Sequence, residues 1–318
     1  MPDEILAIAT GYMAAKQLFS ASRAGLFAAL AEGPATAAEL AGRTGLPERS
    51  ARVLADAMNG LGLLERQDGR YRNAPAAERH LAGGQDVDLR PFLAFLEDIS
   101  YPHWLGYHDS MTTAEPVPLD LGGGRMDTFM TGVMTYNALH ARALAACYDF
   151  TRHRRLLDYG GLSGAFLIEA LRAAPGLSGA FVTTFPHVGK SLAEAGMEGR
   201  AAVVEGDVPA GPVPGGFDLV LLEHVVHRYT PADNRAILRR AREAATPDAR
   251  LLVLDFFLDD EPRQRALDAL HAGEYLVIDG TTVYPLAEVR EWVGEAGWRP
   301  VELLALPGCP RVLVAEAR

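Results

Sequence analysis

The sequence Leu156-Leu157-Asp158-Tyr159-Gly160-Gly161-Leu162-Ser163-Gly164 decides the fold class of this chain. It begins as a short apolar strand and ends in a glycine-rich turn, and residues 165–173 continue with apolar side chains at helical spacing. A strand, a glycine turn and a helix open the nucleotide site of doubly wound α/β sheets, where the helix start offers free N–H groups to the ligand. A tight turn without a ligand is the alternative, because a lone glycine cluster does not separate the two.

The sequence after this turn alternates between apolar strands and amphipathic helices, which predicts a parallel sheet. The predicted strands are 156–157, 179–184, 201–204, 217–222 and 250–255, with a final pair at 300–304 and 311–316. The predicted helices are 165–173, 188–195, 232–244, 264–275 and 286–296. The strands at 217–222 and 250–255 are near-continuous apolar runs, which is typical of central parallel strands covered on both faces. We therefore predict an α/β fold with a Rossmann-like sheet.

The N-terminal region predicts a winged helix. Residues 4–31 carry apolar side chains at helical spacing, and Thr36 begins a capping-box pattern for a short helix at 37–43. A second helix at 47–61 precedes a hairpin with Asp68-Gly69 at its turn. This second helix has balanced charge, so we favour a packing and dimerisation module over a DNA-binding one.

A helical segment joins the two regions. We predict one helix from Asp88 to Ile99, a break at 101–104, a loop at 113–124 and a long helix from Asp127 to Phe150. Aromatic and methionine side chains here can line an apolar ligand pocket, with ordinary core packing at helical spacing as the alternative. These residues are Trp104, Tyr107, Phe129, Met130, Met134 and Tyr136. The predicted organisation is a winged-helix dimerisation domain at 1–90, a helical linker and substrate-pocket segment at 91–150, and a Rossmann-like domain at 151–318.

The composition excludes several classes of protein. The chain has 318 residues, of which 49% are hydrophobic and 22% charged, with a formal net charge of -11. This acidic balance argues against a nucleic-acid partner, which requires clustered Lys and Arg. Cys147 and Cys309 are far apart in the sequence, so we expect neither a disulfide scaffold nor a structural zinc site. We also expect no secretory signal, no bilayer-spanning segment and a cytoplasmic location.

The whole chain resembles the S-adenosylmethionine-dependent small-molecule O-methyltransferases that carry an N-terminal winged-helix dimerisation domain. This group contains plant phenylpropanoid and bacterial polyketide methyltransferases. The resemblance rests on several segments taken together, none of which is specific alone. The segments are residues 157–164, Pro186-His187-Val188, Glu205-Gly206-Asp207-Val208, Phe217-Asp218-Leu219-Val220, Val226-His227-Arg228-Tyr229, Pro231-Ala232-Asp233 and Ala296-Gly297-Trp298.

The resemblance implies an S-adenosylmethionine site at the carboxyl ends of the strands. The glycine turn is expected to pass under the methionine part of the cofactor, and Asp207 is expected to lie beside the adenine. Independently of the resemblance, Asp158 at the strand end can accept hydrogen bonds from a polar ligand group. The implied cofactor-binding residues are Asp158, Gly160, Gly161, Gly164, Thr184, Asp207 and Val208.

The resemblance also implies a general base, His227, that deprotonates the acceptor hydroxyl and is oriented by Asp255. An imidazole suits this task because imidazoles titrate near neutral pH. Both residues follow neighbouring strands at their carboxyl ends, where open α/β sheets build their sites. A structural histidine is the alternative for His227. We place His224 with the substrate-binding residues and expect no metal ligands and a homodimer.

The chain departs from the family pattern at four positions. Leu162 replaces the third glycine of the turn, and Thr184 replaces the acid that holds the ribose hydroxyls. Val283 lies at or near the position of a second acidic partner of the base, and Arg228 replaces an aspartate. A carboxylate forms stronger charged hydrogen bonds than threonine can, so we expect weak or lost cofactor binding.

Three functions are compatible with these observations. The first is O-methylation of an aromatic or polyketide hydroxyl in natural-product biosynthesis. The second is the same fold without methyl transfer, catalysing a cyclisation, elimination or rearrangement in the same pocket. The third is a winged-helix ligand-binding regulator, which the neutral second helix and the pair formed by His227 and Asp255 argue against.

Overall fold

The computed structural model describes residues 2–84, 87–185 and 187–318, so Pro186 of the family segments lies outside the described residues. The chain forms two compact units. One comprises Met1–Pro102 and Asp120–Tyr136, and the other comprises His103–Leu119 and Asn137–Arg318. The segment at 91–150 therefore contributes to both units. No helix in the described residues has the length and apolar character needed to cross a membrane.

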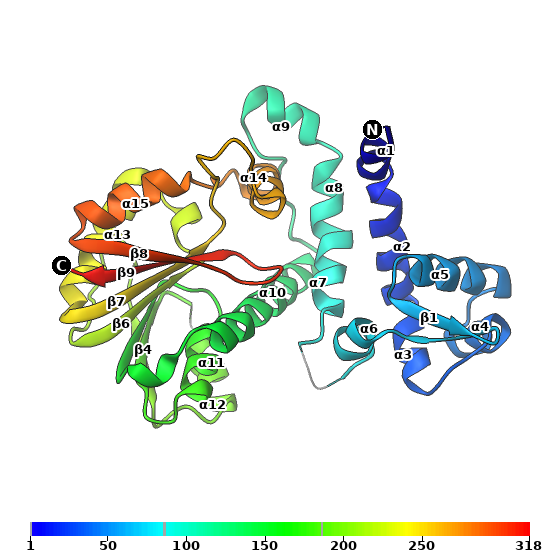
Figure 1. The fold of residues 1–318 in the computed structure, drawn as a ribbon, viewed down its shortest axis with the longest axis horizontal. Helices are drawn as coiled ribbons and strands as arrows, with labels where there is room; N and C mark the ends of the chain where they lie inside the picture. Colours follow the sequence, from blue (N-terminus) through cyan, green and yellow to red (C-terminus); the bar gives the residue numbers. More distant parts are fainter. Residues whose placement is uncertain (1, 85–86, 186) are drawn as a thin grey trace. The chain divides into compact units, whose positions relative to one another are not determined.

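The N-terminal unit contains the predicted winged helix (Figure 1). Thr36 and Glu39 form both hydrogen bonds of a capping box at the start of the following helix. The hairpin turns at Asp68 and Gly69, whose φ values of 48° and 74° match a turn that joins twisted strands. The elements are α1 (Pro2–Ala9), α2 (Gly11–Arg23), α3 (Leu26–Ala31), α4 (Ala37–Thr44), α5 (Glu48–Gly60), β1 (Leu64–Gln67), β2 (Arg70–Asn73) and α6 (Pro75–His80).

Two helix predictions in this part of the chain are wrong. The single helix expected over residues 4–31 is three helices, because the chain turns at Thr10 and at Gly25, which has a left-handed φ of 71°. The break expected at 101–104 is also absent from the described chain, since α7 (Arg90–Phe95) continues through a π-helical turn at Leu96–Ser100 into α8 (Tyr101–Trp104). A π-helical turn keeps the backbone hydrogen-bonded where an inserted residue would otherwise break the helix. The next helices are α9 (Tyr107–Thr113) and α10 (Arg125–Cys147).

The second unit is a seven-stranded sheet with the strand order β5-β4-β3-β6-β7-β9-β8 (Figure 1). Neighbouring strands from β5 to β7 are parallel, whereas β9 runs antiparallel to both β7 and β8. The strands are β3 (Arg155–Tyr159), β4 (Ser178–Thr183), β5 (Ala201–Glu205), β6 (Phe217–Glu223), β7 (Ala245–Asp255), β8 (Trp298–Ala305) and β9 (Arg311–Ala317). This arrangement confirms the predicted α/β class and the central position of β6 and β7.

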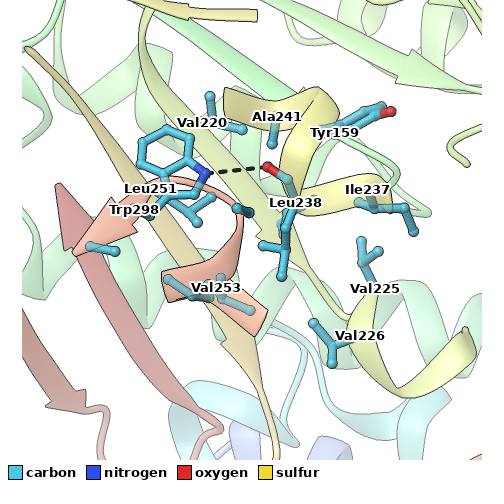
Figure 2. Packing of buried hydrophobic residues seen from close by; sticks show 14 of the residues in the cluster. Tyr159, Val220, Val225, Val226, Ile237, Leu238, Ala241, Leu251, Val253 and Trp298 are labelled. Carbon is cyan, nitrogen blue, oxygen red and sulfur yellow. Dashed lines mark hydrogen bonds between the residues drawn. The ribbon is translucent and has the colours of Figure 1, made fainter. Parts of the chain in front are cut away.

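Helices cover both faces of this sheet and enclose two apolar clusters. The helices are α11 (Ala165–Ala173), α12 (His187–Glu194), α13 (Pro231–Ala244), α14 (Ala266–Asp279) and α15 (Leu286–Glu295), with short 3-10 turns at Phe150–Arg152 and Val226–Arg228. Figure 2 shows one cluster, in which Trp298 donates a hydrogen bond to the Leu238 carbonyl at 3.2 Å. Val225 and Val226 are buried in the same cluster. Their burial anchors the segment that carries the candidate base.

Candidate active site

The glycine turn connects β3 to α11 and requires glycine at specific positions. Gly160 has a φ of 91° and Gly164, which precedes the helix, has a φ of 65°. A Cβ atom on Gly160 would lie 2.9 Å from a methyl carbon of Val208, so a larger residue would push these segments apart. The Tyr159 hydroxyl donates a hydrogen bond to the Val208 carbonyl. The predicted cofactor residues of the turn and of the segment after β5 are thus held together.

Two carboxyl groups lie beneath this turn. Asp158 near the end of β3 and Glu223 at the end of β6 are both fully buried. A Cβ atom on Gly161 would overlap Glu223 Oε1 and lie 3.2 Å from Asp158 Oδ1. Burial raises the pKa of Asp158 well above its usual value, and burial together with the neighbouring Asp158 does the same to the pKa of Glu223. Sequence reasoning missed Glu223, although its position after an apolar strand resembles that of Asp158.

Arg228 connects the glycine turn to the segment that follows β6. Its Nε donates to the His224 carbonyl at 2.8 Å, and its Nη2 donates to the Gly160 carbonyl. The guanidinium also opposes the rise in the pKa of Glu223. The residue that departs from the family pattern therefore has a defined structural role in this chain.

His227 and Asp255 form the candidate acid–base pair. His227 Nδ1 lies 3.0 and 3.1 Å from the two carboxylate oxygens, and the His227 backbone N–H donates to the same group at 3.3 Å. Asp255 also accepts from the backbone N–H of Phe256 at 2.9 Å. Burial alone would raise the pKa of Asp255, but the attraction and hydrogen bonds of His227 lower it, so the carboxylate stays ionised. The His227 side chain retains 11% of its exposure, so its ring is within reach of solvent.

An aromatic side chain of α14 covers His227, and aromatic side chains from residues 103–119 pack on the same helix. The Tyr275 ring stacks on the His227 ring with centroids 4.3 Å apart. A Cβ atom on Gly273 would lie 2.9 Å from Trp104 and 3.1 Å from the Tyr107 hydroxyl, so both predicted pocket residues pack on α14. Trp104 Nε1 donates to Glu274 Oε2 at 2.5 Å. These contacts place Trp104 and Tyr107 on the helix that also covers the candidate base.

His224 has a strained backbone with a φ of 52°, a conformation that residues other than glycine adopt rarely. Its Nε2 lies 3.0 Å from His140 Nδ1, and burial lowers the pKa of His224 to about 3. Burial, followed by the influence of His224, lowers the pKa of His140 well below its usual value. Both rings are therefore neutral and share one hydrogen bond.

The donor atoms of His224, His227 and Asp255 lie within 4.8 Å of one another. Each of these atoms has a partner. His227 Nδ1 is hydrogen-bonded to the Asp255 carboxylate, and His224 Nε2 contacts His140 Nδ1. In the described residues these three side chains are therefore engaged in hydrogen bonds.

The remaining predicted residues are distributed as follows. Thr184 and Asp207 are exposed at the carboxyl ends of β4 and β5, and Leu162 is half-buried. Val283 is buried in the segment before α15, where the Thr282 N–H donates to the His227 carbonyl at 3.3 Å. The expected second acidic partner is thus replaced by an apolar side chain. Phe129, Met130 and Met134 belong to the N-terminal unit, where Phe129 packs edge-on against Phe95.

Comparisons with known proteins identify the family to which the chain belongs. Residues 121–299 match the family model for an O-methyltransferase domain, and residues 6–83 match the model for an O-methyltransferase dimerisation domain. The chain belongs to the O-methyltransferase family. The match extends over both units, which confirms the resemblance predicted from the sequence motifs.

The relatives of this chain match it over nearly its whole length. It is 35% identical to 3-hydroxy-5-methyl-1-naphthoate 3-O-methyltransferase of Streptomyces sahachiroi, over 98% of this chain and 94% of that protein. It is 29% identical to the tetracenomycin polyketide synthesis 8-O-methyl transferase of Streptomyces glaucescens, over 96% of this chain and 94% of that protein. The crystal structure of the S-adenosylmethionine-dependent methyltransferase SibL in its apo form matches with a TM-score of 0.85 and 31% identity, covering 100% of this chain and 99% of that one.

Proposed function

We propose that this O-methyltransferase transfers a methyl group from S-adenosylmethionine to a hydroxyl group of an aromatic or polyketide-type acceptor. The hydrogen bond between His227 and the ionised Asp255 is the observation that carries this proposal. The naphthoate and tetracenomycin relatives support the choice of a hydroxylated aromatic acceptor.

His227 acts as the general base in this proposal. Asp255 accepts a hydrogen bond from Nδ1–H, which fixes the tautomer and leaves Nε2 free to take a proton. A phenol is a poor nucleophile until it loses its proton, so removal of that proton by Nε2 activates the acceptor oxygen. Asp255 stabilises the imidazolium that results. When bound, S-adenosylmethionine supplies the electrophilic methyl group on its sulfonium.

The residues of the glycine turn and the ends of β4 and β5 fit such a cofactor only in part. The turn offers close backbone approach, and buried carboxyl groups lie directly beneath it. Asp158, Gly160, Gly161 and Gly164 would hold the methionine part, and Asp207 and Val208 would flank the adenine. Thr184 offers a hydroxyl where a carboxylate would accept two hydrogen bonds, so we propose weaker cofactor binding than the family pattern provides.

Leu162 and Thr184 also support a second candidate, in which the fold has lost methyl transfer. In that case, His227 would serve proton transfer in a cyclisation, elimination or rearrangement. Calorimetry with S-adenosylmethionine, followed by incubation with hydroxylated naphthoates, separates the two. Methyl transfer requires measurable cofactor binding and a product that carries one added methyl group by mass spectrometry. Absence of both in the folded protein would favour the second candidate.

A further inference from the structure

The buried carboxyl groups beneath the glycine turn have a role that neither His227 nor Asp255 explains. Among the described residues, none of the four carboxyl oxygens of Asp158 and Glu223 has a partner in good hydrogen-bonding geometry. The backbone N–H groups of Leu167 and Leu162 oppose the rise in the pKa of Asp158 and of Glu223, but burial outweighs them. Buried polar groups are normally hydrogen-bonded, and an unpaired buried carboxyl costs stability. A ligand that donates hydrogen bonds to the two carboxyl groups would compensate this cost.

The two carboxyl groups lie against Gly161, in the middle of the turn. Glu223 Oε1 occupies the space that a side chain at Gly161 would take, and Asp158 Oδ1 borders the same space. The two groups come from adjacent strands, β3 and β6, so the sheet itself fixes their spacing. A carboxyl oxygen of Glu223 therefore lies directly against the backbone of Gly161 in the turn.

The charges around the pair favour a cation. The carboxyl groups of Asp158 and Asp255 raise the pKa of Glu223, and the positive charge of Arg228 lowers it. Arg228 already donates its hydrogen bonds to the Gly160 and His224 carbonyls. A second cation placed at the turn would therefore complete the carboxyl pair with hydrogen bonds that Arg228 does not supply.

We propose that Glu223, assisted by Asp158, binds the α-ammonium group of the methionine part of the cofactor. This inference rests on the proposed use of S-adenosylmethionine and adds a residue that selects for an amino-acid cation at the turn. Binding of the ammonium favours the ionised pair, so a proton that the carboxyls hold in the free protein is released to solvent. The adenosine part of the ligand gains nothing from Glu223.

Calorimetry with three ligands tests this assignment. S-adenosylmethionine and S-adenosylhomocysteine both carry the α-ammonium group, whereas 5′-methylthioadenosine lacks the amino-acid part. Glu223→Gln keeps the shape and removes the charge, and Glu291→Gln is the control because Glu291 is an exposed residue of α15. We expect Glu223→Gln to weaken the binding of the first two ligands about tenfold or more, because charged hydrogen bonds contribute most to such binding. The affinity for 5′-methylthioadenosine should not change.

Two further readouts do not depend on turnover. Titrations in buffers of different ionisation enthalpy should show proton release on S-adenosylmethionine binding in the wild-type protein and less in Glu223→Gln. In the free protein, the raised pKa of Glu223 means that the folded state keeps a proton that the unfolded chain releases above about pH 4.5, so the free energy of unfolding falls as pH rises. The substitution should therefore raise the melting temperature more at pH 8 than at pH 5.

The outcomes separate this inference from the proposed function. Equal weakening of all three ligands would mean that Glu223 only supports the loop, and tighter binding of all three would mean that it blocks the site. Either result overturns the inference and leaves methyl transfer intact. A wild-type protein that binds none of the three ligands would overturn the proposed function and the inference together.

Discussion

His227 is the residue on which the proposed chemistry depends. Replacing His227 by alanine should lower kcat about a hundredfold or more, because a positioned general base contributes at least that much. Asp255→Asn should cost less, since orientation of the ring is only part of the effect. Initial rates of methyl transfer measure both, with exposed His108→Ala as the matched control. Wild-type turnover in the His227→Ala protein would assign this histidine a structural role.

Substitutions at Thr184 and Leu162 should raise the affinity for S-adenosylmethionine. Thr184→Asp restores a carboxylate that can accept from two hydroxyl groups, and Leu162→Gly removes a side chain from the turn. Each charged hydrogen bond contributes about 1.5–3 kcal/mol, so the double variant should bind S-adenosylmethionine roughly tenfold to a hundredfold more tightly. The Leu162 carbonyl accepts from His187 Nε2 at 3.0 Å, a backbone contact that glycine keeps.

Calorimetry on the single and double variants measures this gain, and Thr184→Asn provides a neutral control of similar shape. Low-micromolar binding by the wild-type protein, with no gain in the double variant, would contradict the argument from these departures.

The sequence was sufficient to find the residues that follow a recognisable motif but not those that depend on tertiary contacts. His227, Asp255 and Gly160 follow strands in a known order, so their positions were predictable. Tyr275 stacks on His227 from a helix nearly fifty residues later in the chain. Hydrophobic periodicity is read over windows of about 11–18 residues, so it cannot predict this contact. Glu223 was visible as an acid after an apolar strand, yet its significance depends on the overlap with Gly161.

At the scale of elements, apolar periodicity predicted the sheet better than it predicted helix ends. The central strands β6 and β7 were recognisable because buried parallel strands are continuous apolar runs. The first helix was predicted as continuous because its apolar stripe persists through Thr10 and Gly25, where the helix is interrupted. Periodicity reports which face is apolar, and it does not report a change of helix axis.

The packing of α10 against the end of β6 predicts a pH dependence of stability. His140 and His224 are neutral in the folded protein, with the pKa of His224 near 3, whereas histidines of the unfolded chain titrate near 6.5. The unfolded state therefore binds more protons below pH 6.5, and folding stability falls as pH is lowered. Between pH 7 and pH 5, the neutral His224 should cost about 2 kcal/mol, and His140 lowers stability in the same direction.

Urea unfolding at several pH values measures this slope. His140→Gln removes one of the two titrating rings and should reduce the slope, while exposed His108→Gln should leave it unchanged. A slope that is identical in all three proteins would show that other groups dominate the acid response.

At the scale of the whole molecule, the apolar surface of the N-terminal helices predicts a homodimer. Ile5 and Ile8 are 71% and 83% exposed, and Leu6, Tyr12 and Met13 are exposed beside them in the sequence. Neighbouring exposed apolar residues on α1 and α2 mark an interaction surface, and this part of the chain matches an O-methyltransferase dimerisation domain. We expect two copies to pair through these helices in a two-fold dimer.

Ile8→Asp should convert this dimer to a monomer. Burying an isoleucine contributes about 1.5–3 kcal/mol. A two-fold axis places the substitution in the interface twice, so two apolar contacts are lost and two carboxylates are buried. Light scattering at micromolar concentration measures the mass, with Val301→Asp as the control because Val301 is an exposed apolar residue of β8. A wild-type protein that is monomeric under these conditions would show that the exposed stripe is not a self-association surface. A dimer that persists in Ile8→Asp would place the interface on other residues of the N-terminal unit.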